Sequence, residues 1–100
     1  MTDQFHPNLS DVVAGNRDHA AGFDGADLPG APARQLAVVT CMDARLDTYR
    51  ALGLANGEAH IIRNAGGVVT DDVIRSLCLS QRALGTREIV LVHHTDCGLQ

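Results

Sequence analysis

Three short apolar runs, at residues 36–40, 59–62 and 88–93, constrain the fold of this chain most strongly. The first and third runs are nearly continuous, which is typical of strands that are buried on both faces of a sheet. The two segments between them, at residues 46–52 and 70–84, have the spacing of helices. The order strand, helix, strand, helix, strand predicts the α/β class, with a parallel β-sheet core and flanking helices.

The segment at residues 70–84 carries the clearest helix signals. Thr70 is a good N-cap residue, and the two aspartates that follow it lie at the positive end of the helix dipole. Gly85 is expected at the C′ position, where glycine commonly ends a helix. Apolar residues recur at helical spacing and Cys78 falls among them, so we interpret Cys78 as a core residue rather than a ligand.

Residues 1–33 differ in composition from the rest of the chain. They are polar and rich in small residues, and Gly, Asp and Pro accumulate at residues 21–33. Asn8 or Ser10 could cap a short helix, but that helix has little apolar surface and would need to pack on something else, such as a second subunit. The sequence predicts an N-terminal arm with a helix and a linker at residues 1–33, followed by an α/β domain at residues 34–100.

The last residues of the chain bear on the fold as well. Gln100 comes soon after the third predicted strand, and no further segment follows that could form a covering helix. Because a parallel sheet needs cover on both faces, we expect the α/β domain to be incomplete. Either its C-terminal part is missing or a partner covers the sheet.

Charge and composition exclude several classes of protein. The net charge is −4 and no basic run occurs, which argues against nucleic acid or an acidic membrane surface as a partner. No stretch approaches the ~20 apolar residues of a membrane span, and the first residues lack the regions of a secretory signal. The three cysteines are odd in number and far apart, whereas a disulfide framework needs an even, denser set. We therefore expect a cytoplasmic protein with reduced cysteines.

Reactive side chains gather in two segments that directly follow predicted strands, at residues 41–45 and 93–98. In a parallel sheet both segments lie at the carboxyl edge, where ligands bind in open α/β folds. Cys41, His94 and Cys97 supply two thiolates and an imidazole, a set of ligands that favours zinc and leaves a fourth position open. From spacing alone, core packing of the cysteines remains an alternative.

The first of these segments also carries Asp43 and Arg45. If the loop is extended, the guanidinium can hold the carboxylate through two hydrogen bonds; a solvated ion pair of little consequence is the simpler interpretation. In the other interpretation, Asp43 accepts a hydrogen bond from water at the metal, or it takes the fourth coordination position and inactivates the site. His93 is expected to face away from the site, His60 has no clear partner, and Asp96 could hydrogen-bond nearby.

Taken together, these residues resemble those of the β-class carbonic anhydrases. The likeness covers about residues 34–100, and the combined motif is far more specific than either half. The segments that carry it are Cys41-x-Asp43-x-Arg45, Arg63-Asn64-Ala65-Gly66, Thr70-Asp71-Asp72, Leu84-Gly85 and His94-x-x-Cys97-Gly98.

The resemblance implies a cofactor, a reaction and an assembly. It implies Zn²⁺ held by Cys41, His94 and Cys97, with Asp43 and Arg45 as the catalytic dyad beside the metal. The implied enzyme is a zinc lyase, a carbonic anhydrase, which hydrates carbon dioxide reversibly to bicarbonate and a proton. It also implies a homodimer or a higher even oligomer, whose N-terminal helices clasp the neighbouring subunit.

Two other functions share the same residues. The site could hydrolyse carbonyl sulfide or carbon disulfide, which the motif does not distinguish from carbon dioxide. Alternatively, the chain could be a truncated homologue with a non-catalytic zinc site, in which Asp43 is a permanent fourth ligand.

Overall fold

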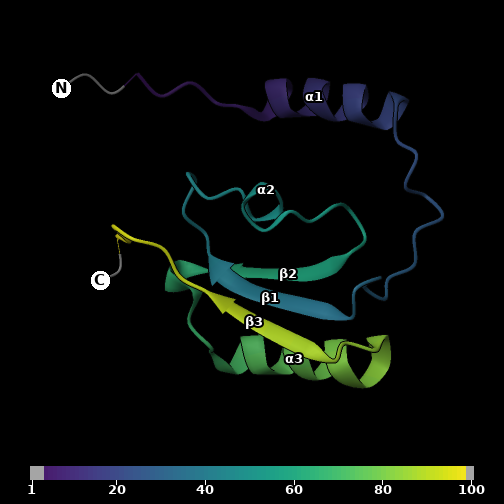
Figure 1. Cartoon of the computed structure of the whole chain (residues 1–100). Coiled ribbons are helices and arrows are strands. Elements are labelled where there is room, and N and C mark those ends of the chain that lie inside the picture. The colour runs from purple at the N-terminus through teal and green to yellow at the C-terminus, as the bar shows by residue number, and fades with distance from the viewer. Residues whose placement is uncertain (1–3, 99–100) are drawn as a thin grey trace.

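The structure of the protein is a computed structural model, in which residues 4–98 are described (Figure 1). Its elements are α1 (Leu9–Ala21), β1 (Leu36–Cys41), α2 (Thr48–Leu52), β2 (Ala59–Asn64), the 3₁₀ turn η1 (Ala65–Gly67), α3 (Asp71–Leu84) and β3 (Glu88–Val92). The predicted alternation of strands and helices is confirmed. Residues 1–3 and 99–100, at the outer ends of the predicted arm and of the predicted α/β domain, lie outside the described residues.

The sheet has three parallel strands in the order β2-β1-β3. Its central strand β1 is buried on both faces, and Ala37, Val38 and Val39 have no exposed surface. The predicted parallel sheet with flanking helices is therefore confirmed, and Figure 1 shows α2 and α3 beside it. Burial on both faces holds for β1 but is wrong for β3, an edge strand of this sheet, where Ile89 is 36% and Leu91 is 53% exposed.

The main apolar cluster joins β1 to α3. Side chains alternate along a strand, so Ala37 and Val39 point to the same face of the sheet. They pack against Val73 and Leu77 of α3, and Ile62 of β2 packs at the edge of this cluster. This packing holds β1 in place, and it therefore also positions Cys41, the residue at the carboxyl end of β1.

β1 and β2 extend slightly beyond their predicted ends, which matters for the site, whereas β3 ends at Val92, one residue before its predicted end. β1 continues to Cys41 and β2 continues to Asn64, so that these two residues pair across the sheet. The helix predicted from residue 46 begins at Thr48, because the Asp47 side chain caps it by accepting a hydrogen bond from the Arg50 N–H (3.2 Å).

The predicted ends of α3 are confirmed. The Thr70 hydroxyl accepts a hydrogen bond from the Val73 N–H at 3.3 Å. Gly85 follows the helix with φ +79°, a left-handed conformation that glycine adopts without steric cost. Local sequence signals were sufficient here because both caps are short-range interactions.

We expect Thr70→Ala to lower the free energy of unfolding by about 1 kcal/mol, since it removes a side-chain N-cap. Urea denaturation measures this change. Asn8→Ala is the matched control, because Asn8 stands at the N-cap position of α1 without a side-chain capping bond, and its effect should stay within about 0.5 kcal/mol. Equal losses in the two variants would contradict the role of the Thr70 cap.

The prediction that Cys78 is a core residue is wrong. α3 buries Val73, Leu77 and Ser80, whereas Cys78 is exposed. Successive helical residues are rotated by about 100°, so residues 73, 77 and 80 share one face and residue 78 lies beside it. The predicted apolar stripe and the observed buried face therefore lie on partly different sides of α3. The buried face includes a small polar residue, Ser80, which a search for apolar residues does not find.

α1 is longer than predicted and runs for 13 residues through Gly15, with none of them buried. A single glycine in a helix interior costs only about 1 kcal/mol, so it weakens the helix without ending it. Figure 1 shows α1 apart from the sheet, at the end of a long connection. Among the described helices, none has both the length and the hydropathy that crossing a bilayer requires.

Candidate metal centre

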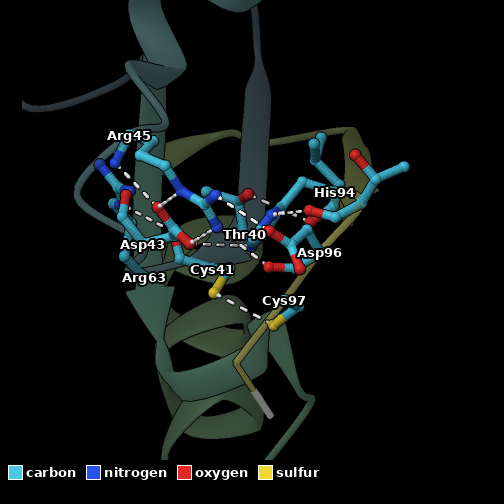
Figure 2. Close-up of polar contacts among 10 residues, drawn as sticks. Thr40, Cys41, Asp43, Arg45, Arg63, His94, Asp96 and Cys97 are labelled. Atoms are coloured by element: carbon cyan, nitrogen blue, oxygen red, sulfur yellow. Dashed lines mark hydrogen bonds and ion pairs between the residues drawn. The ribbon is translucent and has the colours of Figure 1, made fainter. Parts of the chain in front are cut away.

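The carboxyl edge of the sheet brings the two reactive segments together. Cys41 ends β1, and the neighbouring strand β3 pairs with β1 as far as Val92. The chain that leaves β3 therefore passes beside Cys41 (Figure 2). The ligand atoms of Cys41, His94 and Cys97 all lie within 4.8 Å of one another.

The separation of the two thiols fits a tetrahedral metal ion. The Sγ atoms of Cys41 and Cys97 are 3.8 Å apart (Figure 2). Zn–S bonds of about 2.3 Å at the tetrahedral angle place two sulfurs about 3.8 Å apart. A disulfide would need about 2 Å, and both cysteines are free. The sulfur positions therefore match a shared ion.

His94 offers an unpartnered ring nitrogen to the same cluster. Its Nδ1 lies 2.9 Å from the Thr95 carbonyl oxygen, which can only accept, so Nδ1 carries the hydrogen and donates. In the neutral ring Nε2 then has a free lone pair. This atom is buried, and within residues 4–98 it has no hydrogen-bond partner. A buried polar atom without a partner is unfavourable, and a metal ion bound at Nε2 would satisfy it.

The surroundings of Cys41 favour its thiolate. The neighbouring His94 side chain, and then the backbone of Asp43 and Gly66, lowers the pKa of Cys41 from 9.0 to about 7 despite the opposing effect of burial. The same contact with Cys41, together with the Thr95 carbonyl, raises the pKa of His94. Because the thiolate is the form of cysteine that binds metals, the residues present fit a zinc ion.

The metal-free protein is expected to show the lowered pKa of Cys41 directly. A thiol is protonated below its pKa and ionised above it. Because the pKa of Cys41 is lowered from 9.0 to about 7, its thiolate should form at a pH about two units lower than usual. Ultraviolet absorbance of the thiolate is measured against pH, and the Cys41→Ser titration is subtracted. Cys78→Ser is the control. A difference curve with its midpoint at the usual 9.0 would contradict the effect of His94 on Cys41.

Asp43 and Arg45 form the ion pair that the sequence allowed. Arg45 donates from Nη2 to Asp43 Oδ2 at 2.7 Å, from Nε to Oδ1 at 3.0 Å, and from its backbone N–H to Oδ1 at 2.8 Å. The Asp43 side chain is only 15% exposed. These donors hold the pKa of Asp43 well below its usual range and raise the pKa of Arg45. The pair is thus a fixed two-pronged contact rather than a loosely solvated one.

Arg45 also links the two reactive segments to each other. It donates from Nη2 to the Asp96 carbonyl at 2.9 Å and from Nη1 to Asp96 Oδ2 at 3.3 Å. The Asp96 side chain is 90% exposed, so its ion pair contributes little. The carbonyl contact is the firmer one, and it confirms that Asp96 hydrogen-bonds near the site. Oδ2 of Asp43 lies 3.9 Å from Nε2 of His94.

Arg63 is a residue of this edge to which sequence reasoning gave no role. From β2 it donates from Nε to the Cys41 carbonyl at 2.8 Å and from Nη2 to the Asp43 carbonyl at 2.9 Å (Figure 2). The sequence offered one signal for Arg63, namely its place in the segment Arg63-Asn64-Ala65-Gly66 that carries part of the family resemblance. No local spacing rule connects Arg63 to residues 41–43.

The remaining histidines lie outside the cluster. His93 is exposed, with Nε2 3.3 Å from the Gly67 carbonyl oxygen. The prediction that His60 lacks a partner is wrong: Nδ1 lies 2.6 Å from Ser80 Oγ, and Nε2 lies 2.8 Å from the Gly30 carbonyl oxygen. These contacts join segments 20 and 30 residues apart in sequence, so local patterns could not reveal them.

A cavity of about 580 Å³ opens beside the cluster, and its wall is mainly apolar. A smaller one of about 250 Å³ borders Asp43, Arg45 and His94. The residues that line the larger cavity are Cys41, Met42, Asp43, Ala44, Arg45, Ala65, Cys97 and Gly98. The site therefore offers charged groups at one side and an apolar space for a small substrate.

Known proteins are similar to this chain in sequence and in fold. The family model described as carbonic anhydrase matches residues 36–99. "Beta-carbonic anhydrase 1" of Mycobacterium tuberculosis (strain ATCC 25618 / H37Rv) is 66% identical over 89 residues, which are 89% of this chain and 54% of that protein. "Carbon disulfide hydrolase" of Acidianus sp. (strain A1-3) is 54% identical over 66 residues, which are 66% of this chain and 32% of that protein.

The solved structures agree. A crystal structure of carbonic anhydrase from Streptococcus mutans superposes with a TM-score of 0.89 at 52% identity, over 97% of this chain and 58% of that chain. The chain spans about half the length of the mycobacterial relative. The family model covers nearly all of the predicted α/β domain, and the superposition extends over almost the whole chain. The resemblance inferred from the motifs is confirmed, and this chain belongs to the β-class carbonic anhydrase family.

Proposed function

We propose that this protein is a zinc-dependent carbonic anhydrase that converts carbon dioxide and water reversibly to bicarbonate and a proton. The observation that carries the proposal is the cluster of Cys41, His94 and Cys97 beside the fixed Asp43–Arg45 pair. Zinc bound by these three residues would supply a Lewis acid that lowers the pKa of water near neutral pH. This protein's own residues would hold the ion and orient the reactants.

Asp43 is the proposed hydrogen-bond acceptor of the reaction. With its pKa held well below the usual range by Arg45, the carboxylate stays ionised at neutral pH and can only accept. Oδ2, which faces His94 Nε2, would accept a hydrogen bond from the reacting water and fix its orientation. Arg45 occupies both carboxylate oxygens, and this supports an orienting role over the alternative of Asp43 as a permanent fourth ligand.

The substrate is a small uncharged molecule in this proposal. Carbon dioxide carries no charge, and the mainly apolar cavity beside the cluster suits it. Carbon disulfide and carbonyl sulfide are chemically similar, linear and uncharged. Hydrolysis of these sulfur compounds is the second candidate function, because a relative named carbon disulfide hydrolase is 54% identical over 66 residues.

Stopped-flow carbon dioxide hydration, measured with the zinc content of the same preparation, tests the proposal. We expect about one zinc per chain, as the one cluster of three ligands within residues 4–98 implies, and hydration that is lost on chelation. Release of hydrogen sulfide from carbon disulfide and carbonyl sulfide is followed in parallel. Faster turnover of either sulfur compound would favour the second candidate. Bound zinc without turnover of any of the three would show a non-catalytic site.

We also propose a homodimer or higher even oligomer, in which α1 packs on a neighbouring subunit. α1 buries none of its residues, and Leu9, Val12 and Val13 form an exposed apolar stripe at helical spacing. Sedimentation velocity of the wild type and of Val12→Asp tests this assembly.

The two thiolate ligands need reduced cysteines, which fits the cytoplasmic location expected from the sequence.

A further inference from the structure

We propose that Arg63 is a positioning residue, which holds residues 41–43 in the geometry that metal binding requires. The inference rests on the proposed role of Cys41 as a zinc ligand. Arg63 is the next-to-last residue of β2 and stands opposite Thr40 in the register with β1. From there its side chain reaches along the edge of the sheet to the segment that leaves β1 (Figure 2).

The backbone ladder between β1 and β2 ends just where the reactive segment begins. Its last contact is the hydrogen bond from the Met42 N–H to the Asn64 carbonyl at 2.8 Å. Beyond Asn64 the chain turns into η1 at Ala65–Gly67, so β2 supplies no further backbone donors. The Arg63 side chain takes over this function by donating to the Cys41 and Asp43 carbonyls.

Both of these bonds come from one rigid, planar group. Nε and Nη2 of Arg63 lie in the same guanidinium plane, and they meet carbonyls two residues apart at 2.8 and 2.9 Å. Fixing both carbonyls fixes the peptide planes between them, and hence the directions in which Cys41 Sγ and the Asp43 carboxylate leave the backbone. A lysine ammonium is a point charge on a flexible stem and cannot reproduce this fork.

Arg63 also differs from arginines with a surface role. Within residues 4–98 it forms no ion pair, whereas Arg75 on α3 is paired with the exposed Asp72 at 2.9 Å. The Arg63 guanidinium is therefore available to the two carbonyls alone. Arg75→Gln provides a matched control, since it makes the same chemical change away from the metal cluster.

Zinc affinity tests the proposal, measured by competition with a chromophoric chelator. Loss of a residue that orients a ligand typically weakens metal binding by about 10- to 100-fold, and we expect this for Arg63→Gln. Arg63→Lys keeps the charge and should show a smaller loss, while Arg75→Gln should match the wild type. Cobalt-substituted Arg63→Gln should show altered visible absorption bands, because the Cys41 thiolate meets the ion at a different angle. Circular dichroism checks the fold of each variant.

The outcomes separate this inference from the proposed function. A wild-type protein that binds no zinc overturns the metal site itself. Wild-type zinc affinity and an unchanged cobalt spectrum in Arg63→Gln overturn the positioning role alone. If Arg63→Gln does not fold, Arg63→Lys decides: weaker zinc binding in a folded protein supports the inference, and wild-type affinity overturns it. Unfolding of both variants also overturns it, because a positioning role leaves the sheet intact.

Discussion

Replacement of Cys41 by serine is expected to remove zinc from this protein and to abolish carbon dioxide hydration. Serine shortens the side chain's reach and replaces a soft thiolate with a hydroxyl that stays protonated at neutral pH. Only His94 and Cys97 would remain of the three ligands. Loss of a direct ligand should weaken binding by more than the about 10- to 100-fold seen for residues that only orient ligands. Zinc content after dialysis and stopped-flow rates measure both effects.

Cys78→Ser is the matched control for this substitution. Cys78 is exposed on α3, outside the cluster of ligand atoms, so zinc content and hydration rate should equal those of the wild type. A Cys41→Ser protein with one zinc per chain and full activity would show that Cys41 is not a ligand. Parallel losses in the two variants would instead indicate a general sensitivity of the protein to thiol removal.

The convergence of the cluster could be predicted because it follows from topology. Parallel strands direct their carboxyl ends to one edge, so residues that follow the first and third apolar runs had to emerge on the same side. What the sequence left open was whether those strands are neighbours. The order β2-β1-β3 places β1 beside both others, and this brings Cys41 to 3.8 Å from Cys97, measured between their sulfur atoms.

Interactions between distant side chains could not be predicted in the same way. The reach of Arg63 from β2 to the carbonyls after β1 depends on strand register and on side-chain conformation, neither of which a local pattern encodes. The contact of His60 with Ser80 joins β2 to α3, and it accompanies a polar residue, Ser80, on the buried face of α3. The same feature explains why Cys78 was assigned to the core.

Local signals succeeded where the interaction itself is local. Thr70 and Gly85 act on backbone groups within a few residues, so their residue types already indicated the ends of α3. The Asp43–Arg45 pair belongs to this class, since its partners are two residues apart. Whether this pair performs chemistry is a separate question, which a substitution of the carboxylate answers.

Asp43→Asn is expected to retain zinc and to slow carbon dioxide hydration by about 100- to 10,000-fold, the usual contribution of a positioned proton-accepting group. The carboxamide has nearly the same shape, but it is neutral and its NH₂ group can only donate. It therefore cannot accept from Arg45 through both atoms as Asp43 does. Stopped-flow rates and zinc content measured on the same preparation separate chemistry from metal loss. Asp72→Asn, at an exposed ion pair on α3, is the control and should leave both unchanged.

The pH dependence gives an independent check on the same carboxylate. Arg45 lowers the folded-state pKa of Asp43, so the stability from this pair is present above the unfolded value of about 3.9 and is lost only as the pH falls through the lower folded value. Hydration by the wild type should therefore show no acid limb from Asp43 near pH 4. In Arg45→Ala that limb should move up toward the ordinary aspartate value. A full hydration rate in Asp43→Asn would show that Asp43 takes no part in the reaction. Loss of zinc from that variant would show that the carboxylate is a metal ligand instead.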